Sequence, residues 1–150
     1  MCLNRWPQFT KCFRCLSLKA GVVLFSIFEL LLSSAIFAHV ELIVGDIDEE
    51  VVFVNCLKAI MMIRIISTFI LISSWSGVVL KCNIDLFLQM YIYVTMTSTV
   101  LHFIYCITFF CFGFETYLVK VIVQLILSLV AYAVIAYMLV IVNSFRMYIT

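Results

Sequence analysis

The residues best suited to chemistry recur every three or four positions in one apolar segment: Tyr91, Thr95, Ser98 or Thr99, His102 and Cys106. This spacing places them on one face of a helix. With His102 as the titrating group, such a face could line a path for protons or a solute. Alternatively, the hydroxyls bond back to their own helix and a neutral His102 packs between helices. We expect this structural role, because the sequence shows no internal repeat and its single proline, Pro7, lies outside the segment.

Charged residues also interrupt other apolar segments. Glu29 lies near the middle of the first segment, where a carboxylate costs about 2.5–3.5 kcal/mol unless it is protonated, paired or turned toward other helices. Counting about 1.5 Å of rise per residue from each segment's middle places Arg64 of the second segment close in depth to His39 and Glu41. We therefore predict that Arg64 pairs with Glu41, with Glu29 as second choice. The alternative is that Arg64 reaches outward alone to the lipid head groups.

Three cysteines, Cys2, Cys12 and Cys15, lie in a basic stretch before the first apolar segment. Cys12-x-x-Cys15 could be half of a zinc site, but four ligands are needed and the stretch has no histidine. Cysteines beside a membrane segment and among basic residues are typical of reversible palmitoylation, so we expect lipidation at these positions. Free thiols in a reducing compartment are the remaining alternative.

The elements that position these residues are membrane helices. The 150-residue chain is 67% hydrophobic and 11% charged, whereas a soluble domain is roughly 45–50% apolar. About 20 apolar residues cross the hydrocarbon core of a bilayer, and four such segments occur, at 20–44, 59–80, 88–112 and 117–142. The sequence predicts an all-α membrane protein, an antiparallel bundle of four transmembrane helices. We divide the chain into a basic tail (1–19), a four-span domain (20–142) and a second tail (143–150).

The charges predict the orientation of this bundle. Four basic residues and no acidic one precede the first span, whereas the loop after it holds Asp46, Asp48, Glu49 and Glu50. By the positive-inside rule, both termini are cytoplasmic and the acidic loop faces outside or a lumen. The basic tail would also be attracted to anionic lipid.

Small and polar residues on the spans predict close helix packing. Ser34 with Ala38, and Ser73 with Gly77, are small residues four positions apart, a spacing that lets another helix approach closely. Gln124 shares a face of the fourth span with Ser128 and Ala131. Cys56 and Cys111 both lie toward the predicted outer side and could form a disulfide, although buried free cysteines are common in spans.

Enzymatic motifs are missing from the sequence. It has no His/Cys cluster with metal-ligand spacing, no glycine-rich phosphate loop, and no Ser/His/Asp set with a water-accessible domain to hold it. The basic residues are too few, and too close to lipid, to indicate nucleic-acid binding. We therefore expect no catalytic residue, no metal and no cofactor.

One stretch carries a family resemblance. The run Cys12-Phe-Arg-Cys-Leu-Ser-Leu-Lys-Ala-Gly21, followed directly by an apolar span, resembles the entry of the small four-span insect proteins of the pasiflora type, which are distantly similar to the lysosome-associated transmembrane family. The resemblance implies a non-enzymatic protein needed to assemble septate junctions, the paracellular barrier of arthropod epithelia. The sequence after the last span lacks the proline-containing and tyrosine-based sorting signals of the lysosomal relatives.

We accordingly expect a structural or assembly component of cell contacts, located at lateral junctions of the plasma membrane. Its partners would be other integral membrane proteins and membrane lipid, in a homo- or hetero-oligomer. The alternative is an endolysosomal transporter, or a transport or sorting accessory, that uses Glu29, Arg64 and His102.

Overall fold

Four long helices make up the described part of the chain in the computed structural model, which covers residues 17–44, 51–76, 84–113 and 118–149. The helices are α1 (Leu18–Val44), α2 (Val51–Ser76), α3 (Ile84–Gly113) and α4 (Leu118–Ile149), and no strand occurs among these residues. Each is long and apolar enough to cross a membrane. The predicted fold class, an all-helical protein with four membrane-crossing helices, is confirmed.

Local sequence explains where the first helix begins. Ser17 caps α1: its Oγ accepts a hydrogen bond from the Ala20 backbone N–H at 3.3 Å, and its carbonyl accepts one from Gly21 N–H at 2.9 Å. Inside a bilayer every backbone polar group must be satisfied within the segment, which a continuous helix achieves. The helices carry apolar residues all round, because their outward faces would meet lipid rather than water.

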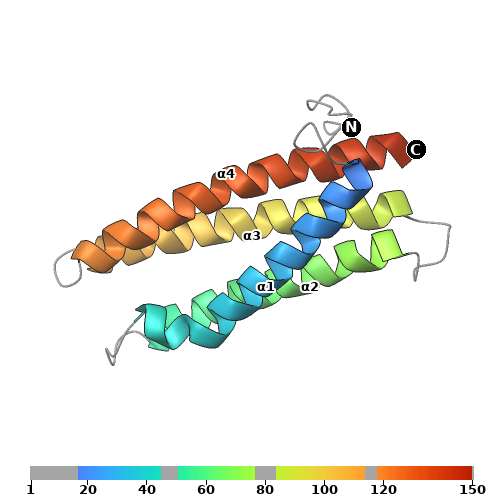
Figure 1. The fold of residues 1–150 in the computed structure, drawn as a ribbon. Coiled ribbons are helices and arrows are strands. Elements are labelled where there is room, and N and C mark those ends of the chain that lie inside the picture. Colours follow the sequence, from blue (N-terminus) through green and yellow to red (C-terminus); the bar gives the residue numbers. More distant parts are fainter. Residues whose placement is uncertain (1–16, 45–50, 77–83, 114–117, 150) are drawn as a thin grey trace.

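The helices form an up-and-down bundle in which each packs against the next and α1 also packs against α4 (Figure 1). We call the end where α1 begins and α4 ends the terminal end, and the opposite end the far end. Figure 1 shows α1 starting beside the last turns of α4 and running obliquely across the bundle to the start of α2. Consequently, α1 lies close to α4 only near the terminal end.

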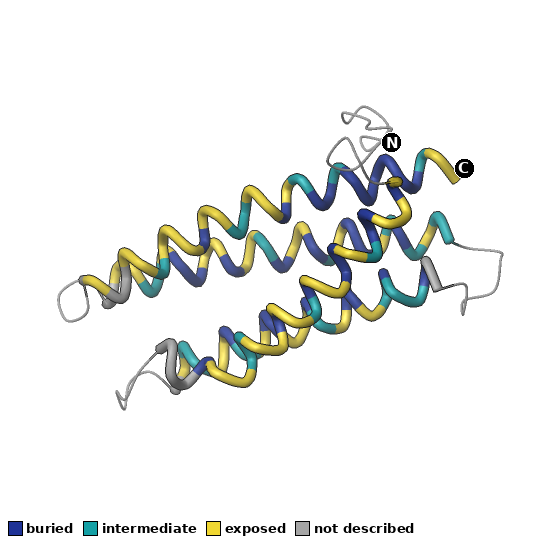
Figure 2. The backbone as a smooth tube through the Cα atoms, viewed as in Figure 1, coloured by how far each residue is buried: buried dark blue, intermediate teal, exposed yellow. Residues whose placement is uncertain are grey.

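Two clusters of buried side chains reflect this oblique path. The cluster at the terminal end joins all four helices, including Leu18 and Phe25 of α1 and Phe145 of α4. The cluster at the far end centres on Val40, Leu57 and Tyr105, with its other buried members on α2 and α3 and none on α4. Figure 2 shows the result: α4 is largely buried toward the terminal end and largely exposed toward the far end.

The helix boundaries differ from those expected. Helix α2 begins at Val51 rather than at residue 59, and α4 continues to Ile149, through residues that the sequence analysis placed in a tail. Lys58 lies within α2, and the first turns of that helix, with Phe53 and Val54, pack on the far-end cluster. Lysine side chains can run along a helix to the interface, so a lysine does not end a span.

Candidate functional site

A buried ion pair joins α1 to α2. Arg64 Nη2 donates a hydrogen bond to Glu29 Oε1 at 2.9 Å, and the two side chains are only 8% and 7% exposed. Both residues lie within a few positions of the middle of their helices, at depths where a lone charge would face hydrocarbon. Each charge therefore neutralises the other within the bundle.

Tyr91 of α3 is the third member of this buried group. Its hydroxyl donates a hydrogen bond to Glu29 Oε2 at 2.7 Å and lies 3.4 Å from Met138 Sδ on α4. Both carboxylate oxygens are thus hydrogen-bonded, and the Tyr91 side chain is fully buried. We call Glu29, Arg64 and Tyr91 the central cluster; through Met138 it touches all four helices.

The backbone carbonyl of Arg64 accepts hydrogen bonds from two side-chain hydroxyls of the same helix. The hydroxyls of Ser67 and Thr68 both donate to the Arg64 carbonyl, at 2.8 and 2.9 Å. Both side chains are fully buried, so back-bonding to their own helix satisfies hydroxyls that could not reach water.

The partner of Arg64 corrects the first-choice prediction. Arg64 pairs with Glu29, the second choice, whereas the side chain of Glu41 lies outside the described residues. The depth of Arg64 was predicted from a second span at 59–80. The middle of that span lies about six residues from the middle of the observed α2. At about 1.5 Å per residue this error displaced Arg64 by roughly 9 Å, away from the level of Glu29.

A second polar cluster surrounds His102 toward the far end, where α3 meets α4. The His102 Nδ1 atom lies 3.0 Å from the Tyr132 hydroxyl, and the imidazole stacks on Tyr105 with ring centroids 6.1 Å apart. Cys106 Sγ lies 3.3 Å from Ser128 Oγ and accepts a longer contact from the Tyr132 hydroxyl at 3.8 Å. We call His102, Cys106, Ser128 and Tyr132 the His102 cluster.

The polar positions of α3 agree with the structural interpretation of its periodicity, except that the buried Thr95 hydroxyl has no hydrogen-bond partner among the described residues. Tyr91, Thr95, Ser98, His102 and Cys106 are all buried. The hydroxyls of Ser98 and Thr99 donate back to the Thr95 carbonyl, at 3.0 and 2.7 Å. Hydroxyls that bond to their own helix and a histidine that bonds to the next helix are the features of a packed interface.

A Tyr132→Phe substitution tests the contribution of the His102 cluster. We expect a loss of about 0.6 kcal/mol of bundle stability, and at most about 1.7 kcal/mol, the range for hydrogen bonds between membrane helices. Unfolding by denaturing detergent measures it. Tyr148→Phe is the control, since Tyr148 is 81% exposed at the end of the same helix. Equal losses for the two variants would contradict a bonding role for the Tyr132 hydroxyl.

The packing residues predicted from the sequence occupy different environments. Ser34 and Ala38 are exposed on the outside of α1, so the bundle itself does not use this small pair. Ser73 is half-buried and its hydroxyl donates to the Phe69 carbonyl at 2.8 Å. Gly77 and the lipidation candidates Cys2, Cys12 and Cys15 lie outside the described residues.

The suggested disulfide between Cys56 and Cys111 is not formed. Both cysteines are free and exposed. The contact between α2 and α3 at this end is filled by aromatic rings instead, with Phe53 packed edge-on against Tyr105 and Phe109.

An ion pair at the terminal end was not predicted from the sequence. Arg146 Nη1 lies 3.5 Å from Asp85 Oδ1, and Gln89 Nε2 donates to Asp85 Oδ2 at 2.7 Å. Arg146 had been placed in a tail, yet α4 is still helical there and the side chain is buried. The predicted topology could have indicated this pair, because it places the start of the third span and the end of the fourth span at the same end of the bundle.

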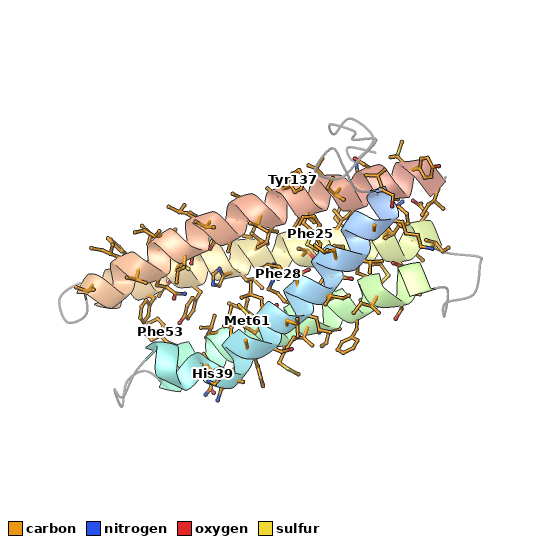
Figure 3. All side chains as sticks on the ribbon, viewed as in Figure 1. Phe25, Phe28, His39, Phe53, Met61 and Tyr137 are labelled. Atoms are coloured by element: carbon orange, nitrogen blue, oxygen red, sulfur yellow. The ribbon has the colours of Figure 1, made fainter. Side chains whose placement is uncertain are left out.

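A cavity of about 430 Å³ lies between α1 and α4 on the far-end side of the central cluster. Phe25, Phe28 and Met61, which Figure 3 labels, are among its apolar lining residues. Its polar lining residues are Glu29, Ser33, Arg64, His102, Gln124 and Ser128. Among the described residues, no three His, Cys, Asp or Glu side chains lie close enough together to hold a metal ion.

Four long apolar helices, with a buried ion pair near the middle of two of them, define a multi-pass membrane protein. No family model, no curated protein and no solved structure matches this chain.

Proposed function

We propose that the protein is a non-enzymatic structural or assembly component of lateral cell contacts of the septate-junction type. The observation that carries this proposal is that the buried charges Glu29 and Arg64 are paired with each other and that His102 is paired with Tyr132. Glu29 binds Arg64 and Tyr91, and His102 contacts Tyr132. Groups engaged in this way hold a bundle together, whereas a catalytic or transporting site leaves polar groups available to a substrate.

The junctional part of the proposal rests on the resemblance of positions 12–21 to the pasiflora-type proteins. In this proposal both termini are cytoplasmic and Cys12 and Cys15 carry lipid. Other integral membrane proteins dock on the exposed small pair of α1, Ser34 and Ala38, where a second helix could approach closely.

Localisation and barrier function test the proposal together. An endogenously tagged copy in a polarised epithelium is expected at lateral junctions, and its depletion is expected to let an excluded dye leak between cells. Re-expressed wild-type protein should restore exclusion, whereas Ala38→Phe should not, because the larger ring blocks close helix approach. Ala133→Phe, at an exposed position of α4, is the matched control and should restore it. Staining confined to acidic vesicles with an intact barrier would refute the proposal.

A second candidate function is favoured by the cavity. Glu29, Arg64 and His102 all line it, and these are the residues that the sequence analysis assigned to an endolysosomal transporter. In that case a His102→Leu variant would change the pH dependence of transport in vesicles. In the junctional case the same variant would affect only assembly.

A further inference from the structure

The cavity between α1 and α4 owes its existence to the divergence of these two helices. Positions 25–36 of α1 and 124–138 of α4 supply most of its lining, and α2 and α3 form its inner wall with Leu57, Met61, Arg64 and His102. Far-half residues of α4 such as Leu127 and Val130 line the cavity while remaining about 60% exposed. A cavity whose lining residues are this exposed, at membrane depth, is accessible to lipid.

The polar groups of the cavity are not equally available to a ligand. Glu29 and Arg64 neutralise each other, and Ser128 and His102 are held within the His102 cluster. Gln124 and Ser33 are different: both line the cavity, and none of the described residues hydrogen bonds to either side chain. Of the two, the half-buried Gln124 lies closer to the far end. The Gln124 amide can therefore accept a hydrogen bond from a ligand or donate one to it, and a ligand with an uncharged hydrogen-bonding group would be favoured there.

The depth of Gln124 indicates how such a ligand would lie. Gln124 is nine to ten residues from the middle of α4, or about 14 Å toward the far end, close to the edge of a hydrocarbon core that extends about 15 Å to each side of its centre. The cavity continues along α4 to Met138, beyond that middle. The Gln124 end of the cavity is thus at the head-group boundary, whereas its other end, near the bilayer centre, contains the mutually neutralised Glu29–Arg64 pair among apolar side chains. A lipid of the far-end leaflet would lie with its polar group at the Gln124 end.

We propose that this cavity binds a sterol from the leaflet at the far end, with the sterol hydroxyl hydrogen-bonded to Gln124. A sterol has one neutral polar group and a rigid apolar body, so little conformational freedom is lost when it binds. The cavity volume of about 430 Å³ lies within the range of ligand pockets, about 300–1,000 Å³. A phospholipid would bring a phosphate, but among the described lining residues the one cation, Arg64, is already bound to Glu29.

Photolabelling of the purified full chain in phosphatidylcholine nanodiscs tests the proposal. A photoreactive sterol is expected to label peptides from 25–36 of α1 and 124–138 of α4. Unlabelled sterol should compete about 3–10-fold better than the same sterol lacking its hydroxyl, the factor expected for one membrane hydrogen bond. Labelling spread evenly over the outward faces of all four helices would overturn the proposal. So would equal competition by the deoxy sterol or by added phospholipid.

Two variants sharpen this test. Gln124→Leu should abolish the preference for sterol over its deoxy analogue while leaving the cavity in place. Ala131→Phe fills the cavity and should remove most labelling, whereas the matched control Ala133→Phe, at an exposed position outside the lining, should label like the wild type. If Ala131→Phe fails to fold, the competition by sterol and by its deoxy analogue in Gln124→Leu still tests the proposed site. An unchanged preference in Gln124→Leu would refute the assigned hydrogen bond and with it the site.

Discussion

Replacing Glu29 by Gln is expected to lower the stability of the bundle by about 3–5 kcal/mol. The substitution keeps the size of the side chain but removes the charge that neutralises Arg64, which then remains as a lone cation near mid-membrane depth. The change in stability is measured by unfolding the purified protein in a denaturing detergent while the loss of helical signal is monitored. Yield of the monodisperse protein should fall in parallel.

Glu41→Gln is the matched control for this prediction. Glu41 lies on the same helix and was the partner expected for Arg64 from the sequence, but Arg64 is bound to Glu29. We expect a much smaller change than for Glu29→Gln, because this substitution leaves the Glu29–Arg64 pair intact. A Glu41→Gln variant as unstable as Glu29→Gln would show that Arg64 depends on both carboxylates.

Tyr91→Phe is expected to have the next largest effect, about 1–2 kcal/mol. It removes the hydroxyl that donates to Glu29 Oε2 at 2.7 Å and leaves that carboxylate oxygen buried without this donor. Such a bond to a charged group is stronger than one between neutral groups. The same detergent titration measures it.

The matched control is Tyr93→Phe on the same helix. Tyr93 is 53% exposed and lies two positions away, on the opposite side of α3 from the buried face. Its substitution should leave the unfolding midpoint unchanged. If both tyrosine variants lost the same stability, the loss would come from α3 generally and not from the bond to Glu29.

The four helices could be predicted from the sequence because apolar length is a local property. Segments of about 20 apolar residues with short connections specify four spans whatever their neighbours are. The first and last residues of the helices were predicted less accurately, because polar residues such as Asn55 and Lys58 lower the local hydropathy without ending the helix. The buried face of α3 was also predictable, since it depends only on the spacing of Thr95, Ser98 and His102 along one helix.

The contacts between helices could not be predicted in the same way. Which carboxylate meets Arg64 depends on the tilt of α1 and on the relative depth of α1 and α2, and a few residues of error in a span's limits change the answer. The cavity depends on how far α1 diverges from α4, which no local pattern encodes (Figure 1). The Arg146–Asp85 contact escaped prediction because α4 is longer than its most apolar stretch.

A double-mutant cycle on Glu29 and Arg64 tests most directly the central claim that a buried ion pair holds α1 and α2 together. Glu29→Gln, Arg64→Gln and the double variant are compared with the wild type by detergent unfolding. We predict that the double variant is at least as stable as Glu29→Gln alone, with a coupling of about 2 kcal/mol or more, because no lone charge remains buried. Losses that simply add would contradict the pairing.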